Sequence, residues 1–340
     1  MLATQPTEAS LRTYYNGHKG KVQALGWNRD GSCLASGAAD ATARLWRIHG
    51  GELRASHGFQ GHRGAIHALA WDPTNACLMV TASKDKTVRV WDSRQPRGAG
   101  VSVSTSGENI NVAWCPDGRI IAVGNDDDVL CFIDARKLQA LHQKKYNHQV
   151  NEFSWSSSGS HFFMTALGGN IEDKSMGTIE VFNCGVGDGT LSHAYSVHAH
   201  TAACYCIDFD PLGRYFATGS ADSLVSIWSL DNLICVRTLD RLGNPIRSLG
   251  FSHDGSMLAS GSEDKFIDVA STESGDQICK IPTMSPINAI AWHTESDLFA
   301  FADESDGNVH VATLDGGVPQ LESGSNTTGL AASHIPPLMQ

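Results

Sequence analysis

Residues 17–46 read GHKGKVQALGWNRDGSCLASGAADATARLW, a Gly-His pair followed by three apolar segments with polar turns between them. Residues 61–91 repeat this arrangement with GH, IHALAW, TASKD and VRVW in the same order. Alternation of apolar with other side chains indicates β-strands, and intervals rich in Asp, Gly, Pro and Asn indicate turns. The chain therefore contains a repeated unit made of short β-strands.

An apolar segment that ends in an aromatic residue, with a turn or small polar residue after it, occurs seven times. The aromatic residues are Trp27, Trp71, Trp114, Trp155, Phe209, Phe251 and Trp292. They lie 41 to 54 residues apart, a period typical of a β-propeller with four-stranded blades. We predict an all-β fold, a seven-bladed WD-repeat β-propeller that occupies residues 11–315 as a single closed ring.

The two ends of the chain differ in composition from the repeats. We predict a disordered N-terminus at 1–10, after which the apolar and aromatic segment Leu11–Tyr15 completes the last blade and closes the ring. Residues 316–340 are rich in Gly, Ser, Thr and Pro with few charges, which favours a flexible tail. The fourth repeat is the longest, and its extra segments, ALGGNIEDKSMG and NCGVGDGTLSH, are predicted to form exposed loops.

The same polar residue types recur in three repeats: a His before the first strand, a Ser or Thr on the second, an Asp in the next turn and a Trp on the third. They are His18, Ser36, Asp40 and Trp46 in repeat one, His62, Thr81 or Ser83, Asp85 and Trp91 in repeat two, and His200, Asp222 and Trp228 in repeat five. We predict that each set forms a hydrogen-bonded network that joins the strands of its blade. Because a catalytic triad would not need three copies, the recurrence favours a structural role.

A further set of residues is defined by its distance from the seven aromatic residues. Two residues before each aromatic the side chain is always apolar, which predicts packing between blades. Four residues before, the side chain is mostly polar, with Ile110 as an exception, and we place this set at one mouth of the central channel. Its polar members are Gln23, His67, Asn151, Tyr205, Arg247 and Asn288. Two interpretations remain open: a partner-binding surface, and a ring that only hydrates the channel.

Composition narrows the range of functions. The net charge of −11, with Lys144–Lys145 as the longest basic run, argues against general binding of a phosphate backbone. Nine cysteines without a CxxC pair predict free thiols in a reducing compartment. The first residues lack the features of a signal peptide, and no apolar run reaches the ~20 residues of a membrane span. We expect a soluble intracellular protein without a metal, a cofactor or a small-molecule substrate.

Several segments carry a resemblance to a known family. They are SGENINVAWCPDG (106–118), IAVGNDDDVLCFIDARK (121–137), VNEFSW (150–155), AHTAACYCIDFDPLGRYFATGSADSLVSIWSLDNLICVRTL (199–239) and FSHDGSMLASGSEDKFIDVA (251–270). In two of the irregular repeats, Ile133 and Ala270 stand where the Trp of a regular repeat would be. Over roughly residues 12–312 the chain resembles the WD-repeat subunits of the THO complex. It departs from them in the loops of repeat four, in a shorter repeat seven and at Gly243-Asn244-Pro245, where the family tends to carry a Trp before the Pro.

The resemblance implies a non-enzymatic scaffold subunit in the nucleus. The THO complex assembles on nascent transcripts and couples transcription to the packaging and export of messenger RNA. The partners implied are the other THO subunits, chiefly the large helical scaffold subunit, with RNA contacted only indirectly. No residue role follows from the resemblance alone.

Two other functions are compatible with a propeller. The WDxR sequence Trp91-Asp92-Ser93-Arg94 could serve a substrate receptor of a cullin-RING ubiquitin ligase, although Asp and Arg often follow a blade Trp for reasons of turn geometry and solubility. An enzyme is disfavoured because the sequence has no metal-binding cluster, nucleophile elbow or phosphate-binding glycine loop. Co-purification with THO subunits or with a ligase adaptor would discriminate a THO scaffold subunit from a ligase receptor.

Overall fold

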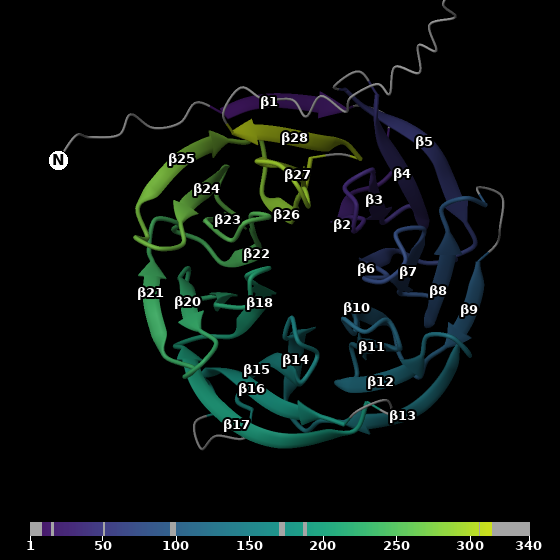
Figure 1. Cartoon of the computed structure of the whole chain (residues 1–340), viewed down its shortest axis with the longest axis horizontal. Helices are drawn as coiled ribbons and strands as arrows, with labels where there is room; N and C mark the ends of the chain where they lie inside the picture. The colour runs from purple at the N-terminus through teal and green to yellow at the C-terminus, as the bar shows by residue number, and fades with distance from the viewer. Residues whose placement is uncertain are drawn as a thin grey trace, which may run out of the picture.

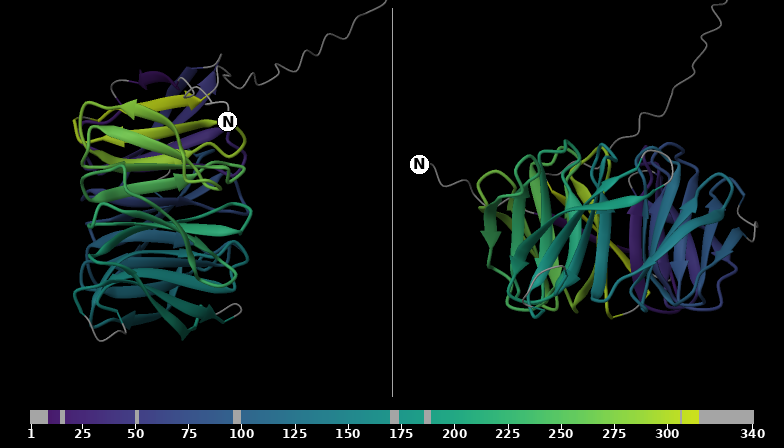
Figure 2. Two further views of the ribbon diagram at one scale, coloured as in Figure 1. Left: turned by 90° about the vertical axis from the view of Figure 1, so that its left-hand side faces the viewer. Right: turned by 90° about the horizontal axis from the view of Figure 1, so that it is seen from below.

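A computed structural model describes residues 9–14, 17–49, 52–95, 100–169, 174–185, 189–305 and 307–314. These residues form 28 β-strands, joined by turns and bends, and contain no helix. The strands make seven four-stranded sheets, which stand side by side around a central channel (Figure 1). Seen from the side, the sheets form a thick ring (Figure 2). The predicted all-β, seven-bladed propeller is confirmed.

Blades one to six each take their strands in chain order from the channel outward. Blade one contains β2 (Val22–Trp27), β3 (Cys33–Ala38), β4 (Thr42–His49) and β5 (Glu52–Gln60); blade two β6 (Ile66–Trp71), β7 (Leu78–Ser83), β8 (Thr87–Asp92) and β9 (Val101–Ser104). Blade three contains β10 (Asn109–Trp114), β11 (Ile120–Asn125), β12 (Val129–Asp134) and β13 (Gln139–Lys145); blade four β14 (Gln149–Trp155), β15 (His161–Leu167), β16 (Gly177–Cys184) and β17 (Leu191–His200). Blade five contains β18 (Cys204–Phe209), β19 (Tyr215–Ser220), β20 (Val225–Ser229) and β21 (Cys235–Leu239); blade six β22 (Ile246–Phe251), β23 (Met257–Ser262), β24 (Phe266–Ser271) and β25 (Gln277–Pro282).

Blade seven is built from both ends of the chain. Its inner strands are β26 (Ile287–Trp292), β27 (Leu298–Asp303) and β28 (Val309–Leu314), and its outer strand is β1 (Ala9–Tyr14). β1 pairs antiparallel with β28, from Ala9 opposite Leu314 to Tyr14 opposite Val309 (Figure 1). The structure thus closes the ring with the predicted segment, but β1 begins at Ala9, so residues 9 and 10 belong to the ring and not to the N-terminal segment predicted at 1–10. Residues 1–8, Tyr15 and 316–340 lie outside the described residues.

The seven aromatic residues that revealed the repeat each end the innermost strand of a blade. Two of them also join neighbouring blades, since Trp71 Nε1 donates to Gly26 O at 2.8 Å and Trp27 Nε1 donates to Ala291 O at 3.2 Å. A side chain that fills the gap between sheets and donates across it removes both a void and an unpaired polar group. The period read from the sequence is therefore the period of contacts between blades.

The core lies between blades rather than inside them. One cluster joins Leu45 and Phe59 of blade one to Ile66 and Trp71 of blade two, and similar clusters join the other pairs. At Gly37, on the second strand of blade one, a Cβ atom would lie 2.6 Å from Ile66 Cγ2 of blade two. The absence of a side chain there lets adjacent blades approach closely. In the part of the chain that the structure describes, no helix is long and apolar enough to cross a membrane.

Deleting residues 1–14 removes β1 and leaves β28 as an unpaired edge strand. We expect a large drop in the midpoint of thermal unfolding and a greater tendency to aggregate, measured by circular dichroism and light scattering. Deletion of 316–340 is the matched truncation, and its midpoint should stay close to that of the full chain. Equal losses from the two truncations would contradict closure by β1.

Candidate functional site

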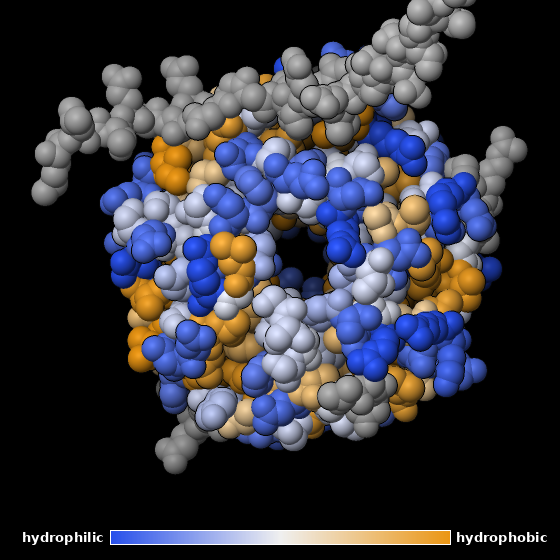
Figure 3. All heavy atoms as spheres, viewed as in Figure 1, coloured by the Kyte–Doolittle hydropathy of each residue, from blue (hydrophilic) through white to orange (hydrophobic). Residues whose placement is uncertain are grey.

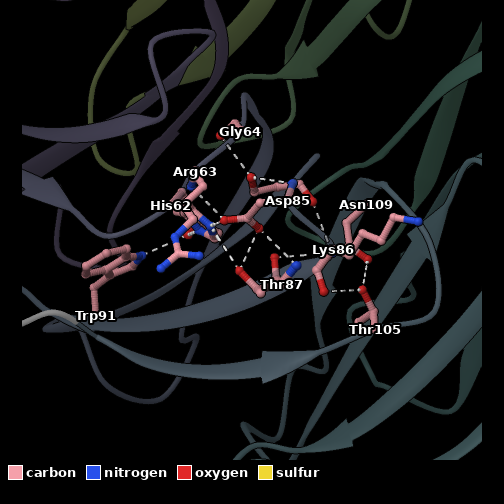
Figure 4. A network of polar contacts seen from close by, with 11 residues as sticks. His62, Arg63, Gly64, Asp85, Lys86, Thr87, Trp91, Thr105 and Asn109 are labelled. Carbon is pink, nitrogen blue, oxygen red and sulfur yellow. Dashed lines mark hydrogen bonds and ion pairs between the residues drawn. The ribbon is translucent and has the colours of Figure 1, made fainter.

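The predicted polar network of blade two is assembled around His62 (Figure 4). His62 Nδ1 lies 2.9 Å from Asp85 Oδ2, and His62 Nε2 lies 2.8 Å from Thr81 Oγ1. Trp91 Nε1 donates to the same Thr81 hydroxyl at 2.8 Å. Thr81, rather than Ser83, is the hydroxyl of this set, because Ser83 Oγ donates to Gly64 O instead. Side chains from the loop before the blade, two strands and a turn are thereby joined.

Blades one and five contain the same arrangement. In blade one His18 Nε2 lies 2.7 Å from Ser36 Oγ, to which Trp46 Nε1 donates at 2.9 Å, and His18 Nδ1 lies 3.3 Å from Asp40 Oδ1. In blade five the hydroxyl is that of Thr218, which the sequence analysis did not name. The distances there are 3.0 Å from Thr218 to His200, 2.9 Å from Trp228 Nε1 to Thr218, and 3.1 Å from His200 Nδ1 to Asp222 Oδ2.

The networks of blades one and two have one consistent direction of donation. Burial lowers the pKa of His18 and His62, more than the neighbouring aspartates raise it, so both rings are neutral near pH 7. Burial alone would raise the pKa of Asp85, but bonds from Thr87, the Arg63 backbone and His62 lower it to about 2. The Trp N–H then donates to the hydroxyl, the hydroxyl to Nε2, and Nδ1–H to the carboxylate. Every member is satisfied, which is the condition for a buried polar network to stabilise one packing.

The aspartates also hold the loop that leads into each blade. Asp40, Asp85 and Asp222 each accept the backbone N–H of the residue after the His, at 2.8, 2.8 and 3.0 Å. Each therefore fixes both the turn between the second and third strands and the entry to the first strand. This geometry is structural: the networks lie within the blades, and their histidines are at most 8% exposed.

Two irregular blades replace the network by different contacts. In blade four Tyr146, nine residues before Trp155, takes the place of the His and packs against Phe182 with ring centroids 6.2 Å apart. In blade six Leu242 stands at the corresponding place, and Arg241 beside it donates to the carboxylate of Asp268 from Nε at 3.0 Å and Nη2 at 2.8 Å. Sequence reasoning missed the Arg241–Asp268 pair, because neither residue matches the repeat pattern.

The six polar residues predicted at the channel mouth all line the central cavity, which has a volume of about 650 Å³. On the face seen in Figure 3 the channel is open and surrounded mainly by hydrophilic side chains. The reason for their placement is a β-bulge in the innermost strand of every blade. In blade one, for example, Val22 pairs with Ala38 and Ala24 with Gly37, so that Gln23 is the extra, unpaired residue. His67, Ile110, Asn151, Tyr205, Arg247 and Asn288 occupy the same bulge in the other blades.

Some of these side chains make contacts between blades. Asn151 Nδ2 donates to Cys204 O of blade five at 2.6 Å, and Asn288 Nδ2 donates to Val22 O of blade one at 3.3 Å. Arg247 pairs with Glu263 and lies 5.0 Å above the ring of Tyr205. Some of the residues predicted at the channel mouth thus join neighbouring blades. Neither interpretation of the sequence included this structural role.

Two channel-lining carboxyls were also missed. Glu152 Oε2 accepts the backbone N–H of Ile207 at 2.9 Å, and Asp208 Oδ2 accepts that of Phe251 at 3.0 Å, so each joins its blade to the next. Burial, with a smaller effect of neighbouring carboxylates, raises the pKa of Glu152 to about 8 and that of Asp208 to about 6. The only signal in the sequence was an acidic residue inside otherwise apolar segments, NEFSW and CIDF.

The WDxR sequence forms a local turn. Trp91 is buried in the network of blade two, and Arg94 donates to Asp92 from Nε at 2.9 Å and from Nη2 at 2.7 Å. The two charged residues of the WDxR sequence therefore pair with each other within the turn. All nine cysteines are free thiols, and among the described residues no group of three or more His, Cys, Asp or Glu side chains could hold a metal ion.

Replacing Asp85 or Asp222 with Ala leaves a His, a Thr hydroxyl and a backbone N–H without their acceptor. We expect either change to lower the free energy of unfolding by about 1–3 kcal/mol. Asp127→Ala is the matched control, because Asp127 is exposed and its blade has neither the His nor the Trp. Denaturant unfolding of the three variants provides the measurement, and equal losses at all three positions would contradict the role of the networks.

Replacing Glu152 with Gln removes the ionisable group but keeps an oxygen that can accept the Ile207 N–H. Folding raises the pKa of Glu152 from 4.5 to about 8, so between these pH values the unfolded chain loses this proton while the folded protein keeps it. The free energy of unfolding of the wild type therefore falls as pH rises through this range, by up to about 1.4 kcal/mol per pH unit. The stability of the variant relative to the wild type should therefore increase from pH 5 to pH 8 and then level off. Thermal melts over this range test the expectation, and a difference that does not change with pH would refute it.

Comparison with known proteins agrees with this architecture. The family model of the THOC3 beta-propeller domain matches residues 18–302. The chain is 42% identical to THO complex subunit 3 of Arabidopsis thaliana over 303 residues, which cover 88% of the chain and 92% of that protein. It is 23% identical to the Poly(A)+ RNA export protein of Schizosaccharomyces pombe, over 75% of the chain and 72% of that protein.

A solved structure shows the same fold at lower sequence similarity. The Cps50 (Swd1) beta-propeller domain of Myceliophteria_thermophila superposes with a TM-score of 0.76 at 16% identity, covering 89% of the chain and 99% of that domain. The family match and the alignment with the plant protein both cover nearly all of the ring. The chain therefore belongs to the THOC3 β-propeller family.

Proposed function

We propose that this protein is a non-enzymatic scaffold subunit of a THO complex and supports the packaging and nuclear export of messenger RNA. The observation that carries the proposal is the 42% identity to THO complex subunit 3 over 92% of that protein. The relative named as a poly(A)+ RNA export protein supports the same process. The networks in blades one, two and five support a rigid ring on which partners can be positioned.

The finer parts of the proposal concern partners and place. The chain would act in the nucleus and bind other THO subunits, chiefly the large helical scaffold subunit. The channel mouth, with its bulged residues such as His67 and Tyr205, is a candidate surface for a partner. It combines half-buried polar groups and the exposed Arg247 with a concave opening, a common property of recognition sites.

Affinity purification of the tagged full chain from separated nuclear and cytosolic extracts tests this proposal. THO subunits at equal stoichiometry in the nuclear fraction are the expected result. Recovery of a cullin-ligase adaptor in their place would favour the receptor function instead. An Arg94→Ala variant, which changes the WDxR turn, should keep the THO partners.

Association with RNA should be indirect. A net charge of −11 opposes binding to phosphates, and direct single-strand binding needs aromatic side chains beside clustered Arg or Lys. A salt-series titration of the purified chain with single-stranded RNA should show no specific binding at physiological ionic strength. Tight binding that weakens steeply with salt would contradict a purely scaffolding role.

A further inference from the structure

Beside the opening of the central channel lies a second cavity of about 370 Å³, formed where blades three to six meet. Its walls include Asp126 and Asp128 from the turn between β11 and β12, Asn151 at the bulge of β14, Tyr205 on β18 and Arg247 on β22. A volume of this size, with an aromatic side chain and a few polar groups, is in the range of pockets that bind a ligand or side chain.

The charges of this cavity are not balanced. Arg247 is the one cation among the lining residues that the structure describes, and Glu263 already pairs with it, through Nε at 3.1 Å and Nη2 at 2.5 Å. Asp126 and Asp128 each accept one backbone N–H through Oδ1, from Glu108 at 3.0 Å and from Val150 at 2.9 Å. Within the described part of the chain neither carboxylate has an ion-pair partner, so two negative charges face the cavity uncompensated.

The hydrogen-bonding groups show the same bias. Asn151, which lines the cavity, uses its amide nitrogen on Cys204 O, and among the described contacts its amide oxygen accepts no hydrogen bond. The guanidinium of Arg247 lies 5.0 Å above the ring of Tyr205, so this ring already holds a cation of the protein itself. The cavity therefore offers acceptors and negative charge, and a donor-rich cation is the group that would satisfy both.

We infer that this cavity binds an arginine or lysine side chain from an extended segment of a partner protein. The inference rests on the proposed scaffold function and specifies the chemistry of one partner contact. An arginine fits better than a lysine, because its planar group carries five donors and can pair with two carboxylates at once. A nucleic acid does not fit, since Asp126 and Asp128 would repel its phosphates.

The test uses the purified full chain and three labelled peptides of the form Gly-Ser-X-Ala-X-Ser-Gly, in which X is Arg, Lys or Glu. Fluorescence anisotropy at low ionic strength should show binding of the Arg and Lys peptides, weakened by salt, and no binding of the Glu peptide. Combined replacement of Asp126→Asn and Asp128→Asn should weaken binding of the Arg peptide by at least about tenfold. Asn tolerates the left-handed backbone of Asp128, whose φ is 59°, and it keeps the oxygen that accepts the Val150 N–H.

Asp127→Asn is the matched control, because it removes the same charge from the same turn at a residue that does not line the cavity. It should change the affinity by less than about twofold. An equal loss at Asp127, or no binding of the Arg peptide, would overturn the inference, and thermal melts of all variants exclude unfolding as the cause. Because the peptide assay needs no other subunit, its failure beside intact co-purification of THO subunits would reject this contact and leave the scaffold function standing.

Discussion

The pairing of β1 with β28 is the contact on which the ring depends. Every other blade is made from one continuous segment, but blade seven needs a strand from the start of the chain. The interface between blades seven and one contains Val309 and Leu298 with Val22 and Trp27, and Tyr14 of β1 packs against it. A strand at this position therefore removes an open edge and also covers the last of the interfaces between blades.

Within a blade the structure shows three ways to fix the loop and turn that surround the second strand. Blades one, two and five use a His, a hydroxyl, an Asp and a Trp. Blade four replaces three of these places at once by Tyr146, Met164 and Phe182, all of them in one apolar cluster. A buried network with one missing member leaves polar groups unpaired, which favours joint replacement. In blade four the Tyr146 hydroxyl is the part of this contact that stays buried without a hydrogen-bond partner among the described residues. Blade six instead contains the Arg241–Asp268 ion pair.

The sequence predicted the ring and the three networks, since each depends on residue types at a repeated spacing, and it predicted closure from the apolar and aromatic residues of Leu11–Tyr15. It placed the polar residues at the channel through the same spacing, but it could not show why they project there. The bulge that orients Gln23 and its equivalents is a feature of strand register, which one strand considered alone does not reveal. Glu152 and Arg241 were missed for a related reason: their partners, Ile207 and Asp268, come from strands or blades whose alignment is known only once the sheets are assembled.

The negative charges of the cavity at the mouth come from the turn between the second and third strands of blade three. In blades one, two and five the aspartate of the turn is bound by a His of its own blade and by the loop that precedes it. Blade three has no His at that place, and its turn carries three consecutive aspartates, of which Asp126 and Asp128 each hold only one backbone N–H among the contacts of the described chain. Asp127 stands where the other blades have the network aspartate, one residue before a left-handed residue, so Asp126 and Asp128 are additional charges on either side of it. The departure of blade three from the repeat thus combines a missing His with two added carboxylates, which lie at the point where four blades leave a hollow.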